Sequence, residues 1–238
     1  MKYMGSKSRI ANEIVPIMLK HRKENQWFID MFCGGCHIVE NICGKRIAND
    51  KNKYLIAMWV GLQNNQDRPC IISKELYSKA REEYNNGTNI EFDDFMIGWI
   101  GWMGSYNGRF FDGGYSGHCV GETKRNYIDE QIRNTESQID KLKDVRFFSK
   151  DYSEFDFKEP CLIYCDIPYK DTKQYATSKN FDRNKFFEWC RIMSKNGHVV
   201  FVSEYQAPDD FDCVWQKEIT NSMNQTKTYN SFHERFLM

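Results

Sequence analysis

Residues 162–169 read Leu-Ile-Tyr-Cys-Asp-Ile-Pro-Tyr, an apolar run that ends in a carboxylate and a turn. The apolar residues predict a buried β-strand, and Asp166 then lies at its carboxyl end, where open α/β sheets bind ligands. Pro168 fixes one backbone dihedral angle and removes a donor, so the turn is stiff. Tyr169 adds a flat aromatic face, so the segment could stack on a planar ring and accept hydrogen bonds from its amino group. The alternative for this segment alone is an ordinary strand-to-loop turn.

Strand and helix patterns alternate on both sides of this segment. Strands are expected at 27–32, 46–48, 145–148, 161–165 and 198–203, and a closing hairpin at 213–217 and 232–238. Helices are expected at 8–19, 37–42, 51–62, 73–84, 92–103, 124–142 and 183–194. This alternation predicts an α/β fold with a doubly wound, mainly parallel sheet.

The stretch from residue 61 to residue 127 lacks strand patterns, which predicts an inserted helical subdomain. Residues 1–60 and 128–238 then form the main domain. Within the insertion, the glycine-rich segment 104–121 has no helical period and is expected to be a loop or an irregular hairpin. Because it lacks a periodic apolar face, it is not expected to be buried as core.

The charges balance, because 33 basic and 33 acidic residues give the 238-residue chain no formal net charge. No global attraction to nucleic acid follows, so any contact with a polyanion needs a local patch. The first 23 residues offer one, with Lys2, Lys7, Arg9, Lys20, Arg22 and Lys23 against Glu13. No signal peptide or membrane-length apolar run is visible, which predicts a soluble cytoplasmic protein without membrane contact.

The chain has nine cysteines, an odd number, and many of them lie in apolar segments. Both observations favour free thiols in a reducing compartment. Cys33 and Cys36 have the spacing of a redox pair, but nothing else in the sequence indicates a thioredoxin-like fold. A zinc site would need a second pair at matching spacing, and Cys161 and Cys165 are separated by a predicted strand. No metal site is therefore expected.

Residues 28–35, Phe-Ile-Asp-Met-Phe-Cys-Gly-Gly, predict a strand that runs into a glycine turn. Asp30 and Phe32 lie at the end of the strand, and Gly34 allows close approach of a ligand to the backbone. Asp50 closes the next strand and can accept hydrogen bonds from ribose hydroxyls. The full G-x-G-x-x-G fingerprint of dinucleotide sites is absent, so a phosphate-free nucleoside such as S-adenosylmethionine fits more easily.

The chain opens with Tyr3, Gly5 and Lys7 just before a predicted helix. This segment could close over the carboxylate of a cofactor. Together, the order of the segments resembles that of the Dam-type (D12 class) DNA adenine N6-methyltransferases. Across essentially the whole chain, the matching residues are Tyr3, Gly5, Lys7, Phe32, Cys33, Gly34, Asp50, Asp166, Pro168 and Tyr169.

The resemblance implies transfer of a methyl group from S-adenosylmethionine to the N6 atom of a flipped-out adenine in double-stranded DNA. It implies a Rossmann-like methyltransferase sheet whose insertion recognises the target. The implied catalytic residues are Asp166, Ile167, Pro168 and Tyr169. The implied cofactor-binding residues are Tyr3, Lys7, Asp30, Phe32, Gly34, Asp50 and Asp166.

Two residues depart from the family pattern. Cys36 stands where a second glycine is usual and could crowd the turn, and Ile167 replaces the first proline of Asp-Pro-Pro-Tyr. The resemblance gives position 167 a backbone carbonyl role, so a slower reaction is expected rather than an inactive site.

Residues 105–110, Ser-Tyr-Asn-Gly-Arg-Phe, resemble the start of the family's DNA-reading hairpin, which implies DNA contacts by Tyr106, Asn107 and Arg109. Asparagine can pair with adenine, and arginine with guanine or phosphate. Methylation of cytosine N4 or of RNA adenine, and a non-catalytic DNA-binding protein, remain alternatives. A restriction endonuclease partner in a bacterial or phage-infected cell is possible, and the sequence leaves the oligomeric state open.

Overall fold

A seven-stranded sheet forms the centre of the computed structural model, which describes residues 1–117, 125–168, 181–219 and 232–237. The strand order is β3-β2-β1-β4-β5-β7-β6. The strands are β1 (Phe28–Asp30), β2 (Arg46–Asn49), β3 (Arg146–Phe148), β4 (Leu162–Asp166), β5 (Val199–Glu204), β6 (Cys213–Ile219) and β7 (Phe232–Leu237). The first five are parallel, and β7 runs antiparallel to β5 and β6. The strand order reverses direction between β1 and β4.

The helices begin where the sequence offers capping side chains. Asn52, Ser73, Asp93, Asn126 and Asp182 each accept hydrogen bonds from backbone N–H groups in the first helical turn. The α-helices are α1 (Ala11–Leu19), α2 (Lys53–Gln63), α3 (Lys74–Asn86), α4 (Asp94–Gly104), α5 (Tyr127–Glu136), α6 (Ile139–Leu142) and α7 (Arg183–Lys195). Single 3₁₀ turns are η1 (Val39–Asn41), η2 (Tyr106–Gly108) and η3 (Tyr152–Glu154).

The sheet is covered on both faces, as the doubly wound prediction requires. Successive side chains of a strand point to opposite faces. Leu162 and Tyr164 of β4 lie in the same core as Met18 of α1, whereas Ile163 lies in the same core as Phe186 of α7. The expected mainly parallel α/β fold is therefore confirmed.

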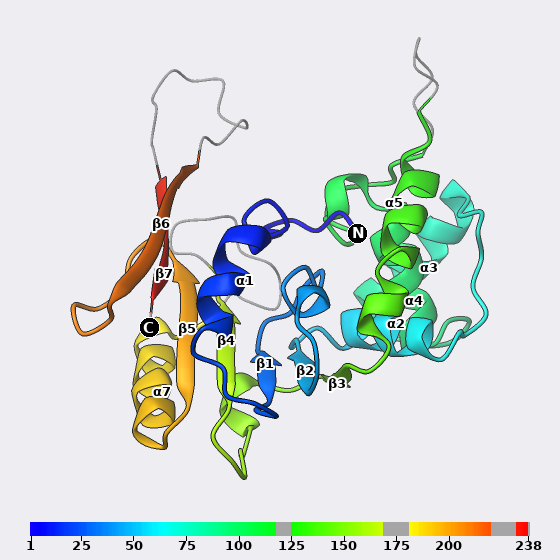
Figure 1. Ribbon diagram of the computed structural model, residues 1–238. Helices are drawn as coiled ribbons and strands as arrows, with labels where there is room; N and C mark the ends of the chain where they lie inside the picture. Colours follow the sequence, from blue (N-terminus) through cyan, green and yellow to red (C-terminus); the bar gives the residue numbers. More distant parts are fainter. Residues whose placement is uncertain (118–124, 169–180, 220–231, 238) are drawn as a thin grey trace.

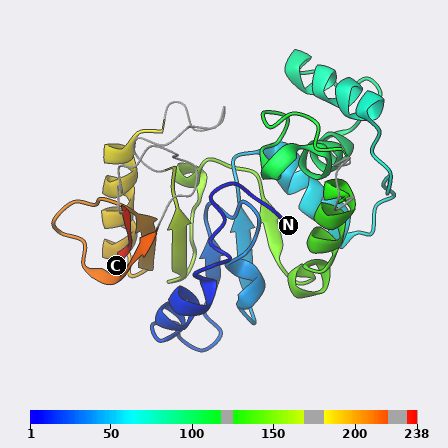
Figure 2. The ribbon, with the colours of Figure 1, turned by 90° about the horizontal axis from the view of Figure 1, so that it is seen from above.

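Helices α2 to α5 gather beyond the β3 side of the sheet (Figures 1 and 2). Helix α4 is their centre and contacts α2, α3 and α5. Its tryptophans Trp99 and Trp102 are almost fully buried. Because α2 and α5 come from the flanks of residues 61–127, the helical unit extends beyond the insertion that the sequence indicates.

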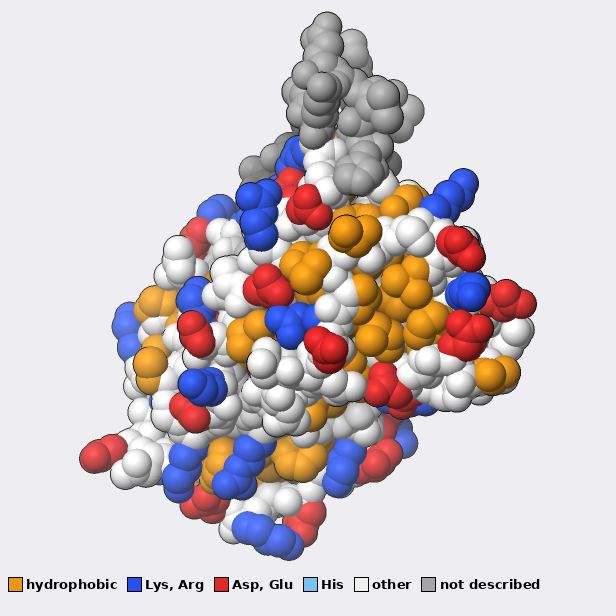
Figure 3. Space-filling model, turned by 90° about the vertical axis from the view of Figure 1, so that its right-hand side faces the viewer, with side chains coloured by type: hydrophobic (Ala, Val, Ile, Leu, Met, Phe, Trp, Pro, Cys, Tyr) orange, Lys and Arg blue, Asp and Glu red, His pale blue; other side chains and the backbone are white. Residues whose placement is uncertain are grey.

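The outer face of this helical unit carries hydrophobic side chains among interspersed basic and acidic ones (Figure 3). Neither sign of charge dominates this face, in keeping with the zero net charge. In the described part of the chain, no helix is long and apolar enough to cross a membrane.

Three sequence expectations need correction. The expected helix 124–142 is divided, because α5 ends at Glu136, and the buried Gln138 before α6 donates to the Gly35 carbonyl oxygen at 3.0 Å. The expected helix 37–42 is only the short η1, as a run of this length gains few helical hydrogen bonds. Segment 104–117 is an irregular hairpin with one bridge between Ser105 and Tyr115, as expected, but it is not excluded from the core.

Two aromatic side chains of segment 104–117 explain why this hairpin is partly buried in the core. Phe110 and Phe111 are 8% and 3% exposed and pack against Trp102 and Tyr77 at centroid distances of 4.9 and 5.2 Å. A pair of adjacent aromatic residues has no helical period, so the sequence pattern does not reveal their burial.

The basic run at the N-terminus is not one open patch. Arg22 donates to the carbonyl oxygens of Gln26, Cys43 and Lys45 at 2.6–3.0 Å, so it ties loops together. Lys7 is buried, as described below.

Candidate active site at the carboxyl edge of the sheet

Three carboxylates meet where β1, β2 and β4 end, which we call the carboxyl edge. Asp30 ends β1, Asp50 directly follows β2, and Asp166 ends β4. Since β1 pairs with both β2 and β4, the register brings these ends together at the point where the strand order reverses. This is where open α/β sheets bind ligands.

Asp166 forms an ion pair with Lys7 from the N-terminal segment. Lys7 Nζ lies 2.8 Å from Asp166 Oδ1, and their side chains are 7% and 20% exposed. Lys7 also donates to the Gly5 carbonyl oxygen at 3.2 Å. The lysine thus brings a positive charge to a strand end where three carboxylates repel one another.

Asp30 is the most deeply buried of the three carboxyl groups, at 1% exposed. Burial raises its pKa well above the usual range, and the negative charge of Asp166 raises it further, while backbone hydrogen bonds from Val39 and Phe32 oppose the shift. Within the described part of the chain, Asp30 Oδ1 has no hydrogen-bond partner. A group of this kind gains most from a cationic ligand.

Asp50 organises the glycine turn that follows β1. Its carboxylate accepts the backbone N–H groups of Gly34 at 3.2 Å and Asn52 at 2.9 Å. Burial raises the pKa of Asp50, and these two hydrogen bonds oppose the shift. The carboxylate therefore links the glycine turn to the start of α2.

Gly34 is required by the packing of Tyr3. Its φ is +46°, and a β-carbon there would lie 2.7 Å from the Tyr3 ring. The Tyr3 ring also stacks on Trp102 of α4, with ring centroids 5.0 Å apart. Tyr3 is thus packed between the glycine turn and the helical unit.

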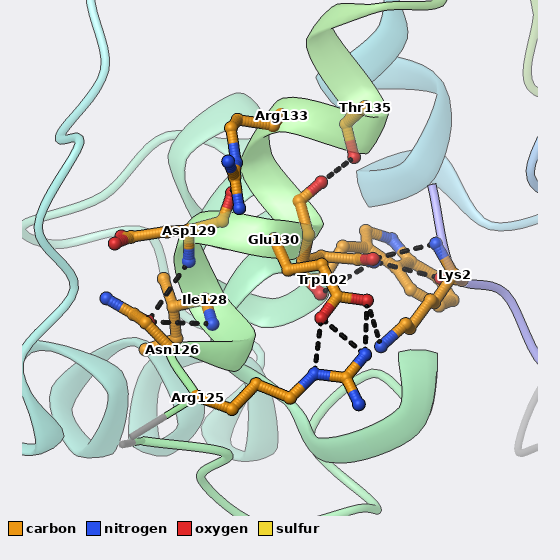
Figure 4. Close-up of polar contacts among 10 residues, drawn as sticks. Lys2, Trp102, Arg125, Asn126, Ile128, Asp129, Glu130, Arg133 and Thr135 are labelled. Carbon is orange, nitrogen blue, oxygen red and sulfur yellow. Dashed lines mark hydrogen bonds and ion pairs between the residues drawn. The ribbon is translucent and has the colours of Figure 1, made fainter. Parts of the chain in front are cut away.

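The start of the N-terminal segment is fixed to α5. The Gln131 side chain accepts the Lys2 backbone N–H at 2.7 Å and donates to the Lys2 carbonyl oxygen at 2.9 Å. The Lys2 side chain pairs with Glu130, which also binds Arg125 (Figure 4). The segment therefore runs from the helical unit at Lys2 to the carboxyl edge at Lys7.

The predicted DNA-reading residues lie on the hairpin beside this segment. Tyr106 is 53% exposed, and its ring contacts Tyr127 edge-to-face at 6.2 Å. Asn107 is exposed with φ +55°, whereas Arg109 is half-buried and pairs with Asp112 at 2.7 Å. The structure thus places the three side chains on one hairpin.

The remaining predicted residues have different surroundings. Ile167 is 2% exposed, and the Pro168 carbonyl oxygen accepts a hydrogen bond from Arg183 at 3.1 Å. Phe32 packs among aromatic rings, 5.9 Å from both Tyr152 and Phe186. The predicted role of Tyr169 lies outside the described residues.

The cysteine pair beside the glycine turn is buried. Cys33 is 6% exposed and Cys36 is fully buried, so Cys36 lies in the core. Burial raises the pKa of both thiols, which disfavours the reactive thiolate. Among the described residues, no group of three or more His, Cys, Asp or Glu side chains could hold a metal ion.

An open cavity of about 660 Å³ lies elsewhere, between α2 and the connection from α3 to α4. Its lining includes Ala57, Phe92 and the Lys53–Asp94 ion pair. None of the predicted site residues lines it.

Sequence reasoning missed several residues that hold the carboxyl edge together. Asn49 donates to the Met31 and Lys150 carbonyl oxygens, both at 3.1 Å, and so joins β1, β2 and the end of β3. A polar residue at the end of a predicted strand was the available signal. Gln131 and Trp102 carried no signal, because their partners are distant in the sequence.

Comparison with known proteins identifies the family. Residues 3–233 match the D12 class N6 adenine-specific DNA methyltransferases. The chain is 25% identical over 211 residues to the type II methyltransferase M.FokI of Planomicrobium okeanokoites, covering 81% of this chain and 31% of that protein. It is 23% identical over 209 residues to the modification methylase StsI of Streptococcus sanguinis, covering 79% of this chain and 31% of that protein. The chain spans about a third of the length of each of these relatives. It belongs to the D12 class of N6 adenine-specific DNA methyltransferases.

Proposed function

We propose that this protein is a site-specific DNA adenine N6-methyltransferase that acts on a flipped-out base. Membership of the family implies S-adenosylmethionine as the methyl donor and DNA as the substrate. The observation that carries the proposal is the arrangement at the carboxyl edge. Asp166 ends the central strand β4 in contact with the Lys7 ammonium, beside the buried Asp30 and the Asp50 glycine turn.

The residues at this edge fit a cationic, nucleoside-bearing donor. Asp30 offers a fully buried carboxyl group with one oxygen unpartnered in the described chain, suited to an ammonium group. Asp50 would accept hydrogen bonds from ribose hydroxyls. Lys7 would face the donor's carboxylate, with packing from Tyr3, Phe32 and Gly34. No metal is required by this scheme.

Bound S-adenosylmethionine would supply an electrophilic methyl group on sulfur. The N6 lone pair of adenine is delocalised into the ring, so the protein must draw it out of conjugation. Asp166 and the Ile167 carbonyl oxygen would do so by accepting the amino hydrogens, an interaction that strengthens as the nitrogen becomes tetrahedral. Lys7 stabilises the ionised carboxylate, Pro168 stiffens the turn, and Tyr169 would stack on the base.

The DNA would be read by residues 61–127, between the two parts of the methyltransferase domain, 1–60 and 128–238. Tyr106 is exposed and could fill the gap that a flipped base leaves, and Asn107 lies beside it for base contact. Arg109 is held in an ion pair with Asp112. It would contact a base or phosphate after this ion pair breaks, or if both side chains move together. A cytoplasmic site of action and a restriction endonuclease partner are part of this proposal, and the relatives' names motivate the partner.

The test is to incubate the protein with methyl-labelled S-adenosylmethionine and either mixed-sequence duplex DNA or RNA, digest the nucleic acid, and identify the labelled nucleoside. Binding to the same DNA is measured in parallel. The proposal predicts N6-methyldeoxyadenosine. N4-methyldeoxycytidine, or label in the RNA reaction alone, would instead establish one of the alternative acceptors. DNA binding without any transfer would indicate a non-catalytic relative.

A further inference from the structure

Arg183, the first residue of α7, contacts the turn that carries the proposed catalytic residues. Its Nη1 donates to the Pro168 carbonyl oxygen at 3.1 Å. Its Nη2 lies 2.7 Å from Glu204 Oε2 and donates to the Gln206 carbonyl oxygen at 3.4 Å. One guanidinium therefore joins the turn after β4, the end of β5 and the start of α7.

Glu204 fixes the position of that guanidinium. It is the last residue of β5, it is 0% exposed, and its other oxygen accepts the Tyr205 backbone N–H at 2.7 Å. A carboxylate buried to this degree is costly unless it is paired, and the rigid, multiply donating Arg183 is suited to the pairing. The Arg183 side chain is only 22% exposed. If it turned away into solvent, the Glu204 carboxylate would be left buried without its ion-pair partner.

The contact matters because of what the turn lacks. Position 167 holds isoleucine where the family motif has a proline, so one backbone dihedral angle of the turn is not fixed covalently. Asp166 and the Ile167 carbonyl group lie immediately before the carbonyl group that Arg183 holds. Anchoring the Pro168 carbonyl oxygen restricts the orientation of both.

We propose that Arg183, held in place by Glu204, is a positioning residue that fixes the Asp166–Pro168 turn in place of the missing proline. This inference rests on the proposed function, because it assigns the turn to methyl transfer. Arg183 contacts the Pro168 carbonyl oxygen and acts through the backbone of the turn.

The test uses a double variant that carries both Arg183→Gln and Glu204→Gln, and compares it to wild type. Changing both residues removes the ion pair without leaving a buried charge, so the variant is expected to fold. Arg191→Gln is the matched control, since Arg191 lies on the same helix and pairs with Asp210 and Glu188 at the surface. The double variant should lose about 10- to 100-fold in kcat, because small displacements of reacting groups cost this much. Its KM for S-adenosylmethionine and the activity of the control should stay within about twofold.

Adding Ile167→Pro separates positioning from general destabilisation. The proline should restore most of the kcat that the double variant loses, because it fixes the backbone of the turn covalently. An unchanged kcat in the double variant, or a loss in kcat that the proline does not restore although the protein remains folded, would overturn the inference.

Hydrogen–deuterium exchange gives a readout that does not depend on catalysis. Backbone amides of residues 162–167 should exchange faster in the double variant than in wild type or Arg191→Gln. Equal exchange rates would also overturn the inference. If wild type transfers no methyl group to DNA, the proposed function fails, and the exchange measurement alone decides the role of Arg183 in holding the turn.

Discussion

The two ends of the N-terminal segment hold their charges in opposite environments. Lys7 is 7% exposed and pairs with Asp166 at the carboxyl edge, whereas Lys2 is 37% exposed and pairs with Glu130 on the helical unit. The first pair lies among buried carboxyl groups. Removing either partner there leaves the other charge buried and unpaired, which is strongly destabilising. Exposed pairs of the second kind contribute about 0–1 kcal/mol and can exchange partners. Chemistry is therefore expected at the first end and adaptable DNA contact at the second.

The largest effect is expected at the buried end. Asp166→Ala should lower kcat by about 10²–10³-fold or more, because it removes a charged acceptor at the transition state. Steady-state methylation kinetics measure this loss, with circular dichroism and cofactor calorimetry on the same sample. A rate close to wild type would remove Asp166 from the mechanism. Asp156→Ala, at an exposed carboxylate that pairs with Lys158, serves as the control for charge removal.

The pH dependence of cofactor binding should report Asp30. The pKa of Asp30 is raised, so the carboxyl group holds its proton to higher pH than an ordinary aspartate. Pairing with a cationic donor requires the carboxylate, so calorimetric affinity should rise as pH rises through that raised pKa. Asp30→Asn should bind weakly and without this pH dependence. A pH-dependent affinity that persists in Asp30→Asn would assign the titration to another group.

The same shift has a consequence for folding. An acid whose pKa is raised in the folded state contributes stability that is complete below its unfolded pKa and is lost as pH rises through the folded pKa. The melting temperature of Asp30→Asn relative to wild type should therefore increase from acidic to neutral and alkaline pH. A constant difference across that range would show that Asp30 does not titrate with folding.

An intermediate effect is expected at the glycine turn. Gly34→Ala should destabilise the protein and weaken cofactor binding, because φ is +46° and the new methyl group would lie 2.7 Å from the Tyr3 ring. Gly87→Ala is the matched control, with φ +65° and nothing within 4 Å of the added methyl group. Backbone strain of about 1 kcal/mol is common to both, so the excess measured by chemical denaturation reports the Tyr3 contact. Equal losses would mean that Tyr3 moves aside freely.

The smallest effects are expected at the hairpin beside the exposed Lys2 end and in the N-terminal basic run. Asn107→Ala and Arg109→Ala should each relax discrimination between DNA sequences, by about 1–3 kcal/mol for each base that the side chain recognises. Lys23→Ala should at most weaken binding uniformly and flatten its salt dependence. Binding to a panel of duplexes at several salt concentrations separates these outcomes. An unchanged sequence preference in both hairpin variants would place recognition elsewhere.

Most of the fold follows from local patterns in the sequence. The apolar runs at 28–30, 162–166 and 199–204 are buried strands, and α2 and α7 lie close to the expected helical ranges 51–62 and 183–194. The carboxyl edge could also be anticipated, because Asp30, Asp50 and Asp166 each follow an apolar strand and parallel strands end together. The family resemblance added the order in which these segments occur.

Contacts between distant segments could not be predicted in this way. The Lys7–Asp166 pair depends on the path of the N-terminal segment, which Gln131 fixes across 129 residues of sequence. Arg183 meets the Pro168 carbonyl oxygen only because α7 packs back against β5. The burial of Phe110 and Phe111 likewise depends on α3 and α4, not on their immediate neighbours.

We expect the methyl donor to bind at the carboxyl edge and not in the cavity beside α2. Hydrogen–deuterium exchange with and without S-adenosylmethionine tests it directly. With the donor bound, peptides covering residues 3–7, 30–36 and 49–52 should exchange more slowly in wild type, and no such protection should occur in Asp30→Asn. Protection confined to residues 89–95 and to the Lys53–Gly61 face of α2, which line the cavity, would contradict it.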